Sequence, residues 1–142
     1  MHHILAAIDG SDCATRALQF AAKQAAEMPA TRLHVLAVQA PVYVYGEVDV
    51  YAGEARMREL AAQQTHAALD AAASMLRDTG ISFSLEQVEG EPASTIARRS
   101  GELGCDWIVI GTRGRGRLET AIIGSVAQQV VHLATVPVTL VK

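Results

Sequence analysis

The amino-acid sequence predicts an α/β protein whose core is a three-layer, doubly wound sheet of five parallel strands. Short apolar runs, which are typical of buried strands, alternate with segments whose apolar residues recur at helical spacing. Strands that alternate with helices form parallel β-α-β units with right-handed crossovers. The 142 residues, 50% of them hydrophobic, suffice for one core, so we expect a single domain over residues 1–142.

The first β-α unit lies at the N-terminus. The apolar run from Ile4 to Ile8 predicts a strand, and a short polar turn follows it. Apolar residues at helical spacing from Ala14 to Ala25 then predict a helix. Ser11 or Asp12 can cap this helix, because a short side-chain oxygen accepts a hydrogen bond from a free N–H of the first turn.

The middle of the chain contains the second crossover. Leu33 to Val38 predicts a buried strand, and Pro41 to Gly53, which holds all three tyrosines, is expected to be a long loop. Glu54 to Arg77 carries apolar residues along one helical face. Ile81 to Val88 alternates apolar and polar residues, as a half-exposed strand at a sheet edge does.

The C-terminal third supplies two further strands and two helices. Pro92 to Leu103 predicts a short helix, because proline is tolerated in a first helical turn. Trp107 to Ile110 predicts the fourth strand, Ser125 to Leu133 the last helix, and Val136 to Val141 the fifth strand. His132, in the last turn of that helix, is expected at the surface, where a helix end favours a cation.

Five-stranded sheets of this class commonly have the order 3-2-1-4-5 or 2-1-3-4-5. The edge-like pattern of the third strand favours the order 3-2-1-4-5. Asp9 follows the first strand and Gly111 ends the fourth. In that order the two strands are neighbours at the topological switch point, where open α/β sheets bind ligands. We therefore expect Asp9 and the loop at Gly111 to share one crevice.

Composition excludes several classes of protein. The net charge of −3 gives no general reason to bind nucleic acid. No apolar run is long enough to span a membrane, and the N-terminal run reaches Asp9 too soon for a signal peptide, so we expect a soluble, cytoplasmic protein. Cys13 and Cys105 lie far apart without metal-ligand spacing, so we expect buried thiols and neither a disulfide nor a zinc site.

The loop after the fourth strand is the strongest functional signal. Gly111-Thr112-Arg113-Gly114 is followed, after nine residues, by Gly124-Ser125 at the start of a helix. Glycines allow the backbone to approach a ligand, and a helix N-terminus favours an anion such as phosphate. The loop is neither a Walker A motif nor a Rossmann fingerprint, because no Gly-Lys pair occurs and Glu119 stands where the third glycine would be.

Three sets of residues together suggest an ATP site. Asp9 can accept hydrogen bonds from a ribose or an adenine amino group. Val38, at the end of the second strand, can present its backbone to the adenine edge and its side chain to the ring. The glycines and Ser125 would surround the phosphates with N–H groups, and the Ser125 hydroxyl can reach phosphate or a bound Mg²⁺. A receiver-type phosphoacceptor domain fits poorly, because Val88-Glu89-Gly90 offers no aspartate after the third strand.

The chain resembles the universal stress proteins over essentially its whole length. The similarity is carried by five segments: Ile4-Leu-Ala-Ala-Ile-Asp-Gly-Ser11, Leu33-His-Val-Leu-Ala-Val38, Val88-Glu-Gly-Glu-Pro92, Asp106-Trp-Ile-Val-Ile-Gly111 and Val136-Pro-Val-Thr-Leu-Val141. The resemblance implies an adenine-nucleotide alpha-hydrolase-like sheet in the order 3-2-1-4-5. It also implies a homodimer through the strand Val136 to Val141, whose exposed apolar edge needs a partner.

Members of that family that bind ATP carry the motif G-x2-G-x9-G-[ST], and Gly111, Gly114, Gly124 and Ser125 match every position. The resemblance therefore implies ATP binding, with Mg²⁺ or Mn²⁺ as the accompanying metal. It implies that Asp9 and the backbone around Val38 contact the nucleoside. The resemblance further implies that two short segments hold the phosphates. The first is Gly111, Thr112, Arg113 and Gly114, and the second is Gly124, Ser125 and Val126.

Three arginines, Arg113, Arg115 and Arg117, interleave with the glycines; they either neutralise phosphate charge or lie on a solvated face of the loop. Hydrolysis needs a positioned base, metal ligands and charge stabilisation, and the sequence offers no convincing set. We therefore expect an ATP-binding, ATP-responsive protein with at most slow hydrolysis. Two alternatives stay open: a slow ATPase or phosphotransferase, and a dimeric interaction protein that works without nucleotide.

Overall fold

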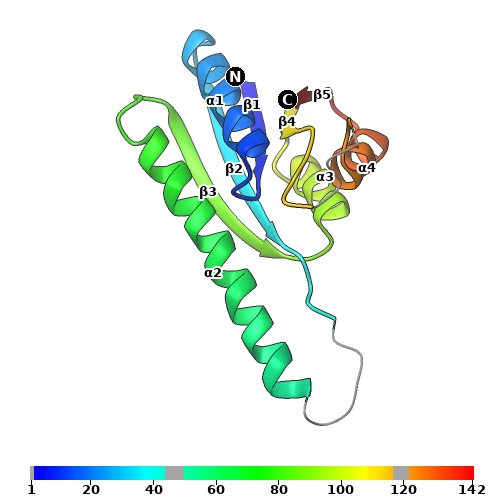
Figure 1. Cartoon of the computed structure of the whole chain (residues 1–142). Coiled ribbons are helices and arrows are strands. Elements are labelled where there is room, and N and C mark those ends of the chain that lie inside the picture. Colours follow the sequence, from blue (N-terminus) through cyan, green and yellow to red (C-terminus); the bar gives the residue numbers. More distant parts are fainter. Residues whose placement is uncertain (1, 44–49, 117–121) are drawn as a thin grey trace.

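The structure, a computed structural model, describes residues 2–43, 50–116 and 122–142, apart from the side chains of residues 50–52. Strands and helices alternate along the chain (Figure 1). The elements are β1 (His2–Ile8), α1 (Asp12–Glu27), β2 (Thr31–Gln39), α2 (Val50–Leu76), β3 (Ser82–Glu89), α3 (Pro92–Glu102), β4 (Trp107–Gly111), α4 (Ser125–Leu133) and β5 (Val138–Val141). The sheet is parallel throughout and has the order β3-β2-β1-β4-β5. The predicted class and strand order are confirmed.

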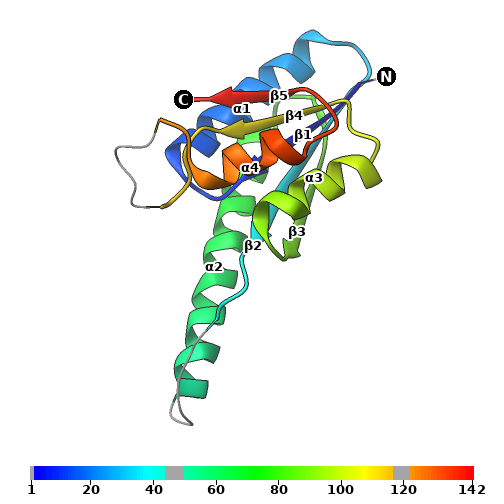
Figure 2. The same ribbon diagram turned by 90° about the vertical axis from the view of Figure 1, so that its right-hand side faces the viewer.

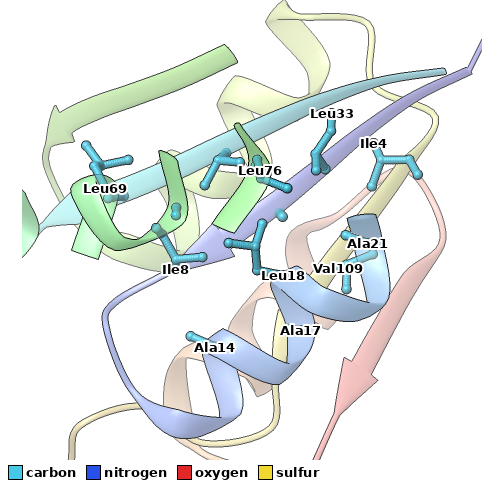
Figure 3. Packing of buried hydrophobic residues seen from close by; sticks show 14 of the residues in the cluster. Ile4, Ile8, Ala14, Ala17, Leu18, Ala21, Leu33, Leu69, Leu76 and Val109 are labelled. Atoms are coloured by element: carbon cyan, nitrogen blue, oxygen red, sulfur yellow. The ribbon is translucent and has the colours of Figure 1, made fainter. Parts of the chain in front are cut away.

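Helices cover both faces of the sheet, which gives three layers (Figure 2). One core lies between the sheet and helices α1 and α2, where side chains such as Ile4, Leu18 and Leu76 meet (Figure 3). The second core lies under α3 and α4, which contribute Ile96 and Val130. The central strands are apolar on both faces because both faces are covered, and this explains their continuous apolar runs.

The N-cap of the first helix and the edge position of the third strand agree with their sequence patterns. Ser11 is the N-cap of α1, and its hydroxyl accepts a hydrogen bond from the Ala14 N–H at 3.2 Å. Among the strands that the structure describes, β3 pairs only with β2, so it is the edge strand that its alternating pattern predicted. Along it, Phe83 packs against the core under α1 and α2, whereas Leu85 is exposed.

Several element boundaries differ from the prediction, most of them by one or two residues, and those of α2 and β5 have an identifiable cause. Helix α2 begins at Val50, inside the segment Pro41 to Gly53 that was expected to be a loop. Its 27 residues reach past the end of the sheet, and its deeply buried residues all lie toward its C-terminus (Figures 1 and 2). β5 begins at Val138 instead of Val136, since Pro137 has no N–H and offers only its carbonyl, which accepts the Ile108 N–H at 3.0 Å.

Among the described residues, no helix combines the length and the hydropathy that crossing a membrane requires. The longest helix, α2, carries charged residues along its N-terminal half, for example Arg56, Arg58 and Glu59.

Candidate functional site

A cavity of ≈ 290 Å³ opens at the carboxyl ends of β1 and β4, the two strands at the switch point. Residues from distant parts of the chain meet there because parallel strands end on the same edge of the sheet. All nine residues singled out from the sequence line this cavity: Asp9, Val38, Gly111, Thr112, Arg113, Gly114, Gly124, Ser125 and Val126. The predicted shared crevice therefore exists as a geometric feature.

One end of the cavity is an apolar slot between the sheet and α3. Leu36 and Val38 of β2 and Ile110 of β4 form its sheet side, and Pro92 and Ile96 of α3 form the opposite wall. Hydrocarbon walls without polar side chains favour a flat, weakly hydrated group. The sequence had indicated Val38 but none of the other four residues, because each belongs to an ordinary core pattern.

The other end of the cavity is formed by the β4–α4 loop and the N-terminus of α4. Gly124 is the N-cap of α4 and supplies no side-chain cap. Its own N–H donates to the Thr112 carbonyl at 2.7 Å, which fixes the helix start against the loop. The N–H groups of the first helical turn have no partner within the helix and carry the positive end of its dipole. This end of the cavity suits an anion.

Asp9 fastens the loop to β1. One carboxylate oxygen accepts the Ser11 N–H at 2.9 Å, and the other accepts the Arg115 N–H at 3.2 Å. Gly114 has to be small here, because a Cβ on it would lie 2.6 Å from the same carboxylate. Each carboxylate oxygen keeps a second lone pair, so Asp9 can still accept a hydrogen bond from a ligand.

The start of the loop is held from its other side as well. The Thr112 N–H donates to the Val141 carbonyl of β5 at 2.8 Å. At Gly111 the first turn of α1 lies so close that an added Cβ would be 2.8 Å from the Cys13 carbonyl carbon. The glycine therefore allows α1 to pack directly on the end of β4.

The loop arginines lie in different surroundings. Arg113 and Arg115 both line the cavity and are exposed. The guanidinium of Arg115 covers Gly10, whose φ of +81° and lack of a Cβ leave room for it. Arg115 also borders a second cavity of ≈ 190 Å³ between α1 and α2. Arg117 falls outside the described residues.

Both cysteines are free and buried, as expected. Burial would raise the pKa of Cys13, but hydrogen bonds from the Thr112 side chain and the Arg113 backbone, with the charge of Arg16, hold that pKa below its ordinary value. Cys105 is different, because burial and the nearby Asp106 raise its pKa to about 11. The thiol beside the loop was not predicted from the sequence, which showed only two distant cysteines.

The described residues contain no group of three His, Cys, Asp or Glu side chains that could hold a metal ion. The oxygen-bearing side chains that line the cavity are those of Asp9, Thr112 and Ser125. A hard cation such as Mg²⁺ prefers oxygen ligands and often keeps several waters. These residues fit a metal that arrives with a phosphate ligand, and they do not form a complete protein site.

A sequence model of the universal stress protein family matches residues 1–142. The chain belongs to the universal stress protein family. A universal stress protein of Thermus aquaticus is 35% identical over 140 residues, which cover 98% of this chain and 97% of the relative. This confirms the family resemblance drawn from the sequence.

Solved structures of universal stress proteins share the fold. UspA from Lactobacillus plantarum matches with a TM-score of 0.87 at 22% identity, over 99% of this chain and 97% of that chain. The universal stress protein from Archaeoglobus fulgidus, in complex with dAMP, matches with a TM-score of 0.71 at 26% identity, over 100% of this chain and 98% of that chain.

Proposed function

We propose that this universal stress protein binds an adenine nucleotide in the cavity at the switch point, with ATP as its ligand, and acts as a nucleotide-responsive regulatory protein. One observation carries the proposal: an apolar slot and a glycine-lined helix N-terminus are the two ends of a single cavity. A base and a phosphate chain need these two environments at once. The related Archaeoglobus protein, which is in complex with dAMP, supports an adenine ligand.

The adenine ring would lie in the apolar slot. β2 extends past the last residue pair that it makes with β1, Ile8 with Ala37, so Val38 pairs only with Val88 of β3 among the described residues. The β1 side of the Val38 backbone thus faces the cavity without a strand partner. Its N–H or C=O would meet the adenine edge there, and the free lone pairs of Asp9 would accept from the ribose.

The phosphates would lie on the glycine loop. The backbone N–H groups around Gly111 to Gly114 and Gly124 to Val126 would donate to phosphate oxygens, and Arg113 or Arg115 would offset their charge. The Ser125 hydroxyl would bind phosphate or the accompanying Mg²⁺ or Mn²⁺.

We also propose that residues 1–142 act as one domain in the cytoplasm.

We propose binding with at most slow hydrolysis. Asp9 is the one carboxylate among the described residues that line the cavity, and backbone N–H groups already engage both of its oxygens. No histidine lines the cavity in the described part of the chain, so no base stands ready to activate water. Multiple-turnover phosphate release well above about 0.01 per second, below the usual enzyme range, would establish the ATPase alternative.

Thermal unfolding with and without ATP tests the proposal. At about a hundredfold excess over Kd, binding adds about 2.7 kcal/mol of stability, which raises the Tm by about 8 °C for a chain of this size. Gly114→Ala should abolish this response, because its Cβ would push the loop away from Asp9. Gly101→Ala is the matched control: it lies on α3 with nothing within 4 Å of the new Cβ, and it should keep the response. An unchanged wild-type Tm at saturating ATP contradicts the proposal.

We further propose a homodimer through antiparallel pairing of the C-terminal strand, Val136 to Val141. Among the described strands β5 pairs only with β4, so its outer edge has no partner in the sheet. Val131 and Leu133 of the preceding helix are exposed and would extend an apolar interface. Sedimentation equilibrium at micromolar concentrations should give twice the chain mass. A monomer, or a dimer formed through another surface, would contradict this.

A further inference from the structure

A polar cluster built around one buried histidine joins α3 to the sheet at the end of the helix away from the cavity. We call it the α3 anchor: His34 of β2, Ser84 and Glu86 of β3, and Arg99 of α3. His34 bonds Ser84 through Nδ1 at 2.7 Å and Glu86 through Nε2 at 2.8 Å. Arg99 holds the same carboxylate with two donors, Nη2 at 2.7 Å and Nε at 3.2 Å. These bonds cross-link two strands and a helix.

The bonding pattern fixes which atom donates between His34 and Glu86. Burial alone would raise the pKa of Glu86, but hydrogen bonds from Arg99 and His34 hold that pKa below its ordinary value. An ionised carboxylate only accepts, so His34 Nε2 carries a proton and donates it. Nδ1 lies beside the Ser84 hydroxyl, which is able both to donate and to accept. His34 is only 6% exposed, so loss of Glu86 would leave the Nε2 proton of His34 without an acceptor and away from water.

A second contact fastens the same end of α3 to β1. The carbonyl of Leu103, the C-cap residue of α3, lies 3.0 Å from His3 Nδ1 and accepts its proton. The ring of His3 stands edge-on to that of His34, with centroids 6.3 Å apart. The C-terminal end of α3 is thus tied directly to β1 and β3, and through Glu86 to His34 of β2.

The α3 anchor lies directly behind the apolar slot. On β2, His34 precedes Leu36 by two residues and therefore lies on the same face of the sheet. On α3, Arg99 follows Ile96 by three residues, about one turn. Leu36 and Ile96 both line the cavity, one from the sheet and one from α3. The bonds between Arg99 and Glu86 therefore hold α3 to the sheet about one helical turn from the slot.

We propose that Glu86, Arg99 and His34 are positioning residues for the base-binding slot, in that they fix the width into which an adenine ring fits. The inference rests on the proposed nucleotide function and deepens it. A ring that touches both walls needs them about 7 Å apart, twice the best separation of two carbon atoms. A wall displaced by about 1 Å loses that contact and weakens binding on the order of tenfold or more.

The test compares two neighbouring arginines. Arg99→Met removes the two bonds to Glu86 and one to Glu102 on its own helix. Arg98→Met, the matched control, removes only the bond of an exposed arginine to the same Glu102. Titration calorimetry measures binding at the two ends of the cavity separately. Adenosine carries the base without phosphates, and inorganic tripolyphosphate carries phosphates without the base. Arg99→Met should weaken adenosine binding on the order of tenfold and leave tripolyphosphate binding within about twofold. Arg98→Met should change neither.

An unchanged adenosine affinity in Arg99→Met overturns the inference, and so does an equal loss for adenosine and tripolyphosphate, which would indicate general loosening. Arg99→Lys keeps the charge but not the paired donors, and it should reproduce most of the loss. If even the wild type binds no adenine compound, the proposed function fails, and methyl NMR tests the positioning by itself. Arg99→Met should then shift the Ile96 methyl resonances and leave those of Ile4, in the other core, unchanged. Unshifted Ile96 resonances would overturn the positioning role of Arg99.

Discussion

Gly111→Ala should destabilise the fold even though the change adds a single methyl group. An ideal Cβ at this position would lie 2.8 Å from the Cys13 carbonyl carbon, 2.9 Å from the Cys13 Cβ and 3.0 Å from the Ala14 nitrogen. Carbon atoms pack best at about 3.5 to 4.0 Å, so the first turn of α1 would have to move by about 0.7 Å or more. Two of the three contacts are backbone atoms, which cannot rotate away.

The size of the loss in unfolding free energy for Gly111→Ala follows from two opposing effects. Overpacking of this kind costs about 1–3 kcal/mol, and the loss of glycine's freedom in the unfolded chain returns about 0.4–1 kcal/mol. The net cost is therefore about 1–2 kcal/mol of unfolding free energy. With a urea dependence of about 2 kcal/mol per molar, the unfolding midpoint should fall by about 0.5–1 M.

Equilibrium unfolding in urea, followed by the fluorescence of the single tryptophan, Trp107 of β4, measures this change. Gly101→Ala should move the midpoint the opposite way, because its Cβ meets nothing within 4 Å and alanine is the better helix former by about 0.5–1 kcal/mol. An unchanged or raised midpoint for Gly111→Ala would refute the reasoning that α1 requires glycine at the end of β4.

Two further predictions follow from the titratable groups. At about pH 8, iodoacetamide should label Cys13 before Cys105, because the two are similarly buried and burial raises the pKa of Cys105 to about 11; peptide mass spectrometry measures this, and faster labelling of Cys105 contradicts it. The lowered pKa of Glu86 adds stability above the ordinary value of about 4.5, and that stability is lost as the pH falls through the folded pKa. Urea midpoints from about pH 7 to about pH 3 should therefore fall less steeply for Glu86→Gln, and parallel curves would count against the prediction.

The sheet order could be predicted because burial leaves a direct mark on sequence. Ile4 to Ile8 and Leu33 to Val38 are apolar on both faces, as central strands must be, whereas Ile81 to Val88 alternates as an edge strand does. The start of α2 was predicted wrongly for the same reason. Residue 53 and residues 55–60 are exposed, so burial leaves little mark near the start of this helix. Gly53 suggested a loop, although an added Cβ there would meet nothing within 4 Å.

The candidate site was predictable at the backbone level and less so at the level of side chains. The glycine spacing and the switch point together placed the loop beside Asp9. The α3 anchor left almost no signal, because His34 and Glu86 are 52 residues apart and Glu86 occupies a position that strand alternation assigns to solvent. His34, inside the otherwise apolar run from Leu33 to Val38, was the one sign of the α3 anchor in the sequence. A buried histidine needs a partner, but the sequence does not say which residue supplies it.

The length of α2 has a practical consequence for hydrodynamics. A helix of 27 residues is about 40 Å long at about 1.5 Å per residue, and its N-terminal half extends past the sheet. Such an extension increases frictional drag without adding mass in proportion. A single chain should therefore elute early from a gel-filtration column, at the volume of a larger globular protein, and imitate a dimer. Light scattering or sedimentation equilibrium, which report mass independently of shape, are the methods that can count the chains.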